Sequence, residues 1–105
     1  MSAARIDFAA LAWDQPAPGV RCKAIARDGR KLRLVEFSPD FVESDWCMKE
    51  HIGLVLEGEL QISFGDGKQE TLAAGDGIFI RGGEPEKHQA RALGSLARLI
   101  LVESA

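Results

Sequence analysis

The stretch His51-Ile52-Gly53-Leu54-Val55-Leu56-Glu57-Gly58-Glu59-Leu60 decides the fold class, because glycines divide short apolar runs into a strand-turn-strand pattern. A second unit of this kind, 75–83, is followed by His88. His51 and His88 are the only two histidines of the chain, and each stands at the start of a β-type run. A small β-barrel could bring both imidazoles into one pocket. Since neutral imidazole is the commonest protein metal ligand, the pair indicates a candidate metal site.

Turn signals elsewhere in the chain favour an all-β fold. Eleven glycines and four prolines punctuate runs rich in Val, Ile, Leu and Phe. Two Asp-Gly pairs predict tight hairpins, because type I′ turns need positive φ at both central residues. These are Asp28-Gly29, between Val20–Arg27 and 31–37, and Asp66-Gly67, between 59–64 and 68–72. We count about eight to ten strands, spaced as in an all-β sandwich or barrel.

The apolar pattern predicts which strands are covered on one face and which on both. Leu60, Ile62 and Phe64 alternate with polar residues, as in a half-buried strand. The runs 52–56 and 78–80 are instead apolar on both faces, as is 99–102. Such strands need cover on both sides, which we expect from a second copy in a homodimer. Cover by the N-terminal segment is the alternative.

Length and composition describe one globular domain. The chain has 105 residues, with 46% hydrophobic and 28% charged residues, which are ordinary globular values. We expect a single domain over 1–105, in which 1–17 form an N-terminal arm and 18–105 form the β-barrel. A short turn is expected around 8–13.

The charge balance argues against a nucleic-acid-binding protein. The net charge is −3, whereas such proteins carry a basic excess that neutralises phosphates. The basic cluster Arg27, Arg30, Lys31 and Arg33 surrounds an Asp-Gly turn and is interpreted as a solvated hairpin. No apolar run is long enough to span a bilayer, and the start of the chain does not read as a signal peptide. Two cysteines imply no disulfide framework, so we expect a cytoplasmic protein with reduced thiols.

At these residues the chain resembles the cupin superfamily, the RmlC-like jelly-roll barrels also described as double-stranded β-helices. The first cupin motif reads G-x5-H-x-H-x(3,4)-E-x6-G, and its end is similar to 55–60. On this alignment His51 stands at the glutamate position. Cys47 and Asp45 then stand at the two histidine positions, and the first glycine of the motif is absent.

The second cupin motif, G-x5-P-x-G-x2-H-x3-N, matches in outline. Gly75 and Gly83 fit its glycines, Arg81 replaces its proline and Ala92 its asparagine. His88 lies two residues beyond the position of the motif histidine. Because a shift of two residues preserves the strand face, His88 is still expected to face the barrel interior.

The resemblance covers most of the chain, about residues 31–103, and implies a jelly-roll cupin barrel. In the family, the motif histidines and glutamate bind a metal inside the barrel. The candidate ligands here are His51, His88, Cys47 and Asp45. This set would suit a divalent Zn, Fe, Ni, Mn or Cu ion. For Cys47 the alternative is a small buried apolar side chain, and for the histidines it is a structural or surface role.

The hypothesis that follows is a small stand-alone cupin that binds a divalent metal and a small organic molecule in its barrel. It could be a metal-dependent enzyme, but the fold does not select a reaction. The alternative is a metal-free small-molecule-binding or regulatory module, which the loss of the standard ligand set favours. A third reading is a structural homodimer whose barrel is filled by side chains around Val55, Phe64 and Phe79.

Overall fold

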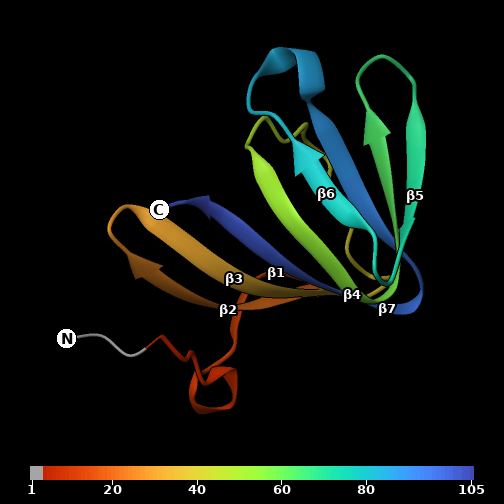
Figure 1. The fold of residues 1–105 in the computed structure, drawn as a ribbon. Helices are drawn as coiled ribbons and strands as arrows, with labels where there is room; N and C mark the ends of the chain where they lie inside the picture. The colour runs from red at the N-terminus through yellow and green to blue at the C-terminus, as the bar shows by residue number, and fades with distance from the viewer. Residues whose placement is uncertain (1–3) are drawn as a thin grey trace.

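The computed structural model describes residues 4–105, which form seven strands and two short 3-10 turns (Figure 1). The elements are η1 (Phe8–Ala10), β1 (Asp14–Ala17), β2 (Val20–Arg27), β3 (Arg30–Phe37), β4 (His51–Phe64), β5 (Gln69–Ala73), β6 (Gly77–Ile80), η2 (Glu84–Glu86) and β7 (His88–Ser104). The expected count of about eight to ten strands was too high. The stretch 51–60, which its glycines were expected to divide into strand, turn and strand, instead belongs to the single long strand β4 and contains only a bend near Gly58.

All strands pair antiparallel, in the order β1-β2-β3-β7-β4-β5, with β6 pairing β4. The long strands β4 and β7 run along each other and divide the sheet into two parts. The first half of β4 pairs with the second half of β7 and with β6, in the part that continues into β3, β2 and β1. The second half of β4 pairs with the first half of β7 and with β5. The two parts face each other at an angle in Figure 1, and the fold is the jelly-roll barrel that the sequence predicts.

The bend between the two parts lies at irregularities in the β4–β7 register, one of which is next to Gly58. Gly58 has φ +74°, and a Cβ there would lie 1.9 Å from the carbonyl oxygen of Leu96. A side chain would therefore be excluded both by backbone conformation and by space. Bulges of this kind sharpen strand bending, which closes the barrel.

The core lies between the two parts of the sheet. Its most completely buried side chains are Val35, Val55, Leu60 and Leu99. The alternation predicted for 60–64 is confirmed, because Leu60 and Ile62 are buried.

The first described residues do not all form a loose arm. Asp14–Ala17, expected within the arm, forms β1 and pairs with β2. The ring of Trp13 lies against the guanidinium of Arg21, 4.0 Å from the ring centroid to Cζ, in a cation–π contact. The turn expected around 8–13 is η1. Within residues 4–105 there is no helix with the length and apolar character needed to cross a membrane.

Candidate metal centre

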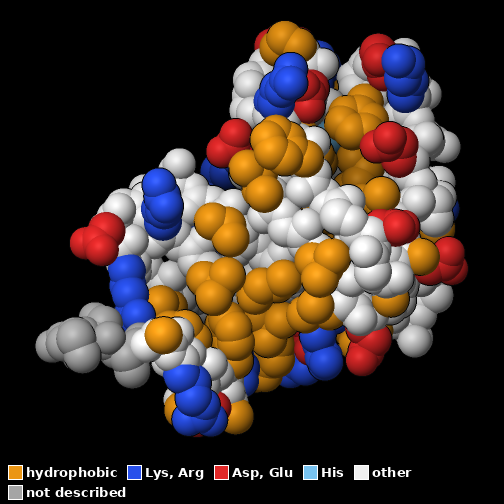
Figure 2. Space-filling model, viewed as in Figure 1, with side chains coloured by type: hydrophobic (Ala, Val, Ile, Leu, Met, Phe, Trp, Pro, Cys, Tyr) orange, Lys and Arg blue, Asp and Glu red, His pale blue; other side chains and the backbone are white. Residues whose placement is uncertain are grey.

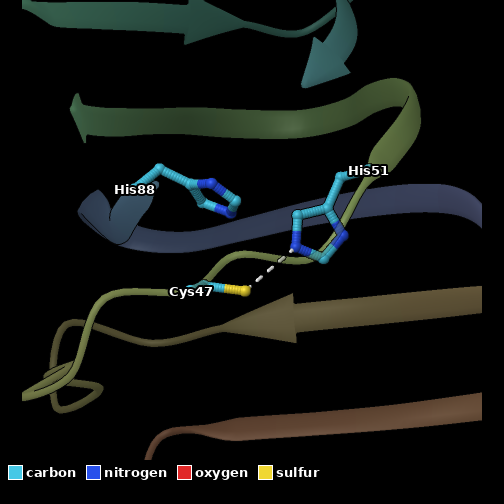
Figure 3. Close-up of side chains that lie close together, drawn as sticks. All are labelled: Cys47, His51 and His88. Carbon is cyan, nitrogen blue, oxygen red and sulfur yellow. Dashed lines mark hydrogen bonds between the residues drawn. The ribbon is translucent and has the colours of Figure 1, made fainter. Parts of the chain in front are cut away.

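Three of the predicted ligands converge inside the barrel. The Cys47 Sγ and one ring nitrogen each from His51 and His88 all lie within 4.8 Å of one another. His51 begins β4 and His88 begins β7, while Cys47 comes from the segment that leads into β4 (Figure 3). The prediction that a β-barrel brings the two histidines together is therefore confirmed, since their ring centroids are 5.1 Å apart.

Backbone pairing fixes Cys47 beside His88. The N–H of Cys47 donates to the carbonyl of His88 at 2.8 Å, and the N–H of His88 donates to the carbonyl of Cys47 at 3.0 Å. This isolated bridge places the thiol next to the imidazole although the residues around Cys47 form no strand. The position of the thiol is thus set by main-chain contacts.

The imidazole of His88 presents an unpaired nitrogen to the site. Its Nδ1 lies 3.0 Å from the carbonyl oxygen of Glu86, which can only accept, so Nδ1 carries the proton. Burial lowers the pKa of His88 below its usual value, although the hydrogen bond to Glu86 opposes this, and the ring is held neutral. The remaining Nε2 is buried and has no hydrogen-bond partner among the described residues. An unpaired polar atom in such a place is costly unless something absent from the protein itself completes it.

The imidazole of His51 is oriented by a different acceptor. Its Nδ1 lies 2.6 Å from Oε2 of Glu103, and its Nε2 lies 3.6 Å from Sγ of Cys47. Burial would raise the pKa of Glu103, but hydrogen bonds from His51 and Arg33 outweigh burial and hold that pKa at about 2. Because the carboxylate is ionised, it accepts the Nδ1 proton of His51. In the neutral ring the lone pair is then on Nε2, which faces Cys47.

Glu103 and Arg33 are site residues that the sequence reading missed. Arg33 was interpreted as part of a solvated hairpin, but its side chain is only 21% exposed and forms two hydrogen bonds of 2.8 Å with Glu103. The physical reason is that Arg33 lies on the inward face of β3. Residue parity gave a usable signal for Glu103, because it follows Leu99 and Leu101 at steps of two and so shares their buried face.

Asp45, the fourth predicted ligand, lies outside the group. It is exposed in the segment before Cys47, where the chain is not a strand. The alternation of a regular strand therefore does not place Asp45 on the same side as Cys47. The acidic side chain that lines the cavity is instead Glu43, whose Oε1 accepts a hydrogen bond of 2.7 Å from the N–H of Ala90.

The three donor residues open onto a small apolar cavity of about 50 Å³. The rest of its wall is mainly aliphatic and aromatic and consists of Phe37, Glu43, Leu60, Ile62, Ile78, Ile80, Ala90, Leu99 and Leu101. For comparison, an engineered cavity of about 150 Å³ binds benzene. The space beside the donors therefore fits a molecule of a few heavy atoms. Phe79, which the third reading places among the side chains that fill the barrel, is instead 67% exposed on the outside.

The donor set fits a transition-metal ion. With metal–ligand bonds of about 2.0–2.3 Å, two ligands of one tetrahedral ion are about 3.5 Å apart, close to the 3.6 Å between Cys47 Sγ and His51 Nε2. The unpaired Nε2 of His88 offers a third donor. One sulfur and two imidazole nitrogens are borderline-soft ligands, which suit Zn, Fe, Ni or Cu better than Mg or Ca.

Solved structures with the same architecture are numerous. A cupin-2 domain containing protein from Shewanella frigidimarina is 27% identical, with a TM-score of 0.64 over 80% of this chain and 79% of that one. KdgF from Halomonas sp. is 21% identical, with a TM-score of 0.80 over 98% of this chain and 94% of that one. The chain belongs to the cupin superfamily. An RmlC-like cupin from Shewanella frigidimarina, 17% identical, has a TM-score of 0.75 over 98% of this chain and 91% of that one.

Other solved structures of similar fold share no activity in their names. Among them are HppE, solved with Fe(II), the polyketide cyclase RemF from Streptomyces resistomycificus and a sugar phosphate isomerase from Silicibacter pomeroyi. No protein-family model and no curated protein sequence matches the chain. The shared fold therefore does not choose a reaction for this cupin.

Proposed function

We propose that this cupin binds one divalent transition-metal ion through Cys47, His51 and His88. The observation that carries the proposal is the buried Nε2 of His88, which has no partner in the described structure and lies in one group with the other two donors. Each imidazole, in its neutral form with Nδ1 protonated, directs the lone pair of Nε2 into the site, and this is the atom that a metal ion needs.

Each residue has a definite part in this binding. Cys47 supplies a thiolate, so its proton must leave when the metal enters. His88 supplies Nε2, because Glu86 holds its other nitrogen. His51 supplies Nε2, because Glu103 holds its Nδ1. When bound, the ion would act as a Lewis acid or activate a water or oxygen molecule.

Three protein ligands leave a coordination position open, as in catalytic rather than structural metal sites. We infer that this position faces the cavity of about 50 Å³, whose size favours a first ligand of one to three heavy atoms, such as water or a diatomic molecule. The organic molecule expected in the barrel would then bind at the mouth of the cavity or require residues 38–50 to move. With Asp45 outside it, the group found among residues 4–105 contains no carboxylate, so manganese becomes the least favoured of the five metals.

Metal content per chain tests the proposal. Tag-free protein purified without chelators is expected to carry close to one equivalent of Zn, Fe, Ni or Cu, or to bind one after reconstitution. Cys47→Ala and His88→Ala should each lower the occupancy strongly. Asp45→Ala is the matched control and should leave the occupancy unchanged, because Asp45 is exposed and lies outside the group of three donors.

Two results would contradict metal binding at this site. One is retention of a full equivalent of metal by the Cys47→Ala/His88→Ala double variant. The other is a wild-type protein that stays empty with every candidate ion. The second result favours the metal-free binding module, which the departures from the cupin ligand motif also favour. Screening of small ligands by thermal shift would then replace metal assays.

A further inference from the structure

A buried ion pair stands directly behind the group of three donors. Arg33 on β3 and Glu103 on β7 are joined by two hydrogen bonds, Nε to Oε1 and Nη2 to Oε2, each 2.8 Å long. The side chains of Glu103 and Arg33 are 8% and 21% exposed. A bidentate guanidinium–carboxylate pair fixes the plane of the carboxylate as well as its position.

The carboxylate held in this way has one further contact. Its Oε2 also accepts from Nδ1 of His51 at 2.6 Å, across a sequence separation of 52 residues. The Nδ1 side of the His51 ring therefore faces an ionised acceptor that Arg33 holds in place. Its opposite nitrogen, Nε2, lies on the side of Cys47 and His88 (Figure 3).

The alternative tautomer of His51 would be incompatible with the group. A proton on Nε2 would occupy the space between the ring and the other donors, and the Nδ1 lone pair would face the Glu103 carboxylate. Two acceptors would then be opposed at 2.6 Å, which is unfavourable in a buried place. The surroundings of His51 therefore select one tautomer.

We propose that Glu103, held in place by Arg33, is the positioning residue that fixes His51 in the tautomer and orientation needed to bind the metal. The inference rests on the proposed metal function of the same site. Partners that hold a ligand histidine in this way typically contribute about 10–100-fold to metal affinity.

His88 provides a comparison within the same site. Its Nδ1 is held by the carbonyl oxygen of Glu86, two residues away, so its orientation depends on the local chain. Changes at Glu103 should consequently alter His51 and leave the tautomer of His88 unchanged. Global loosening of the barrel would alter both rings.

The test uses two variants of the pair and one matched control. Glu103→Gln removes the charge but keeps an oxygen that can accept from His51. The double variant Arg33→Leu/Glu103→Leu removes the acceptor and its partner together, which avoids leaving an unpaired buried charge. Glu36→Gln is the control, since Glu36 is also a buried glutamate held by two arginines, Arg21 and Arg98, but does not line the metal site.

Two measurements report on the variants. Long-range ¹H–¹⁵N NMR of the metal-free protein identifies which nitrogen of each histidine is protonated. Competition with a chromophoric chelator gives the affinity for Zn²⁺. We expect His51 of the wild type to be protonated at Nδ1, with mixed or Nε2 protonation in the double variant. Zn²⁺ affinity should fall by about 10–100-fold in the double variant, less in Glu103→Gln, and remain unchanged in Glu36→Gln.

The outcomes separate this inference from the proposed function. Zn²⁺ binding by the wild type, with the same affinity and the same His51 tautomer in the double variant, overturns the role of Glu103 alone. Protonation of wild-type His51 at Nε2 also overturns it. A wild type that binds none of the metals overturns the proposed function and with it this inference.

Discussion

The outer face of the β3-β7-β4-β6 part of the sheet is apolar, with side chains that range from half-buried to exposed. Cross-strand pairs align its members, which are Leu32, Leu34, Ile52, Leu54, Phe79, Ile100 and Val102. We call this set the outer apolar face. Figure 2 shows hydrophobic side chains gathered on this side of the molecule. Contiguous apolar surface of this kind marks interaction sites in soluble proteins.

A charged row borders the outer apolar face. Arg21, Glu36, Arg98 and Glu57 follow one another across β2, β3, β7 and β4, with ion pairs of 2.7, 2.6 and 3.7 Å between successive members. An apolar centre beside a polar rim is the usual composition of a protein–protein interface. We expect a second copy of the chain to cover the face in a two-fold arrangement, which is the commonest symmetry of soluble oligomers. The homodimer predicted from the sequence thus stays a prediction, now with a defined surface.

Phe79→Asp tests this surface. Phe79 is 67% exposed, and a phenylalanine buries about 200 Å², so about 130 Å² of its surface is available for contact. At about 25 cal/mol per Å², covering that area contributes about 3 kcal/mol per copy. In a two-fold dimer the loss counts twice, about 6 kcal/mol, which corresponds to about 10⁴-fold in Kd. This figure is an upper bound, because association has its own costs, and we expect at least about a hundredfold weakening.

Sedimentation velocity over a wide range of protein concentration measures the effect. The wild type should sediment as a dimer and Phe79→Asp as a monomer with unchanged circular dichroism. Val42→Asp is the control, because Val42 is 80% exposed but lies in the segment before β4, away from the outer apolar face. A monomeric wild type, or equal dimer fractions in the Phe79 and Val42 variants, would refute the reasoning.

Three further predictions concern stability. Leu60→Ala should cost about 2–5 kcal/mol in urea unfolding, since Leu60 is 1% exposed, and a loss below about 1 kcal/mol would contradict the assigned core. Gly58→Ala should lower the melting temperature far more than Gly67→Ala. Both glycines have positive φ, but only at Gly58 would a Cβ clash with backbone, 1.9 Å from the carbonyl oxygen of Leu96. Equal effects of the two substitutions would rule out this close approach. Burial would raise the pKa of Glu36, but hydrogen bonds from Arg21 and Arg98 lower it overall. The ionised Glu36 therefore contributes fully to stability above the ordinary glutamate pKa, and this contribution is lost as pH falls through the lowered pKa of the folded state. On acidification, the unfolding free energy of Glu36→Gln should consequently fall less than that of the wild type. Parallel pH profiles of the two proteins would contradict this.

The strands and their faces could be predicted because they depend on local patterns. Asp28-Gly29 and Asp66-Gly67 both lie in turns between paired strands. Of these two pairs, only Asp28-Gly29 has the positive φ at both residues that the predicted type I′ turn requires, because Asp66 does not have positive φ. Where local signals misled, the long-range context explains it. Glu57-Gly58 has the composition of a turn, yet continuous pairing with β7 keeps it inside β4 as a bend.

The sequence by itself determined that the chain is all-β and that its two histidines stand at the starts of strands, and its resemblance to the cupin motifs implied the jelly-roll barrel. Alternation and turn chemistry are properties of neighbouring residues, so they can be read without the fold. Only the tertiary structure decided which other side chains join them. It brought Cys47 into the group, because a backbone bridge to His88 positions that residue. It left Asp45 outside, because the segment around Asp45 does not form a strand. It also placed Glu103 and Arg33 behind His51, because contacts between strands distant in sequence depend on the register of the whole sheet.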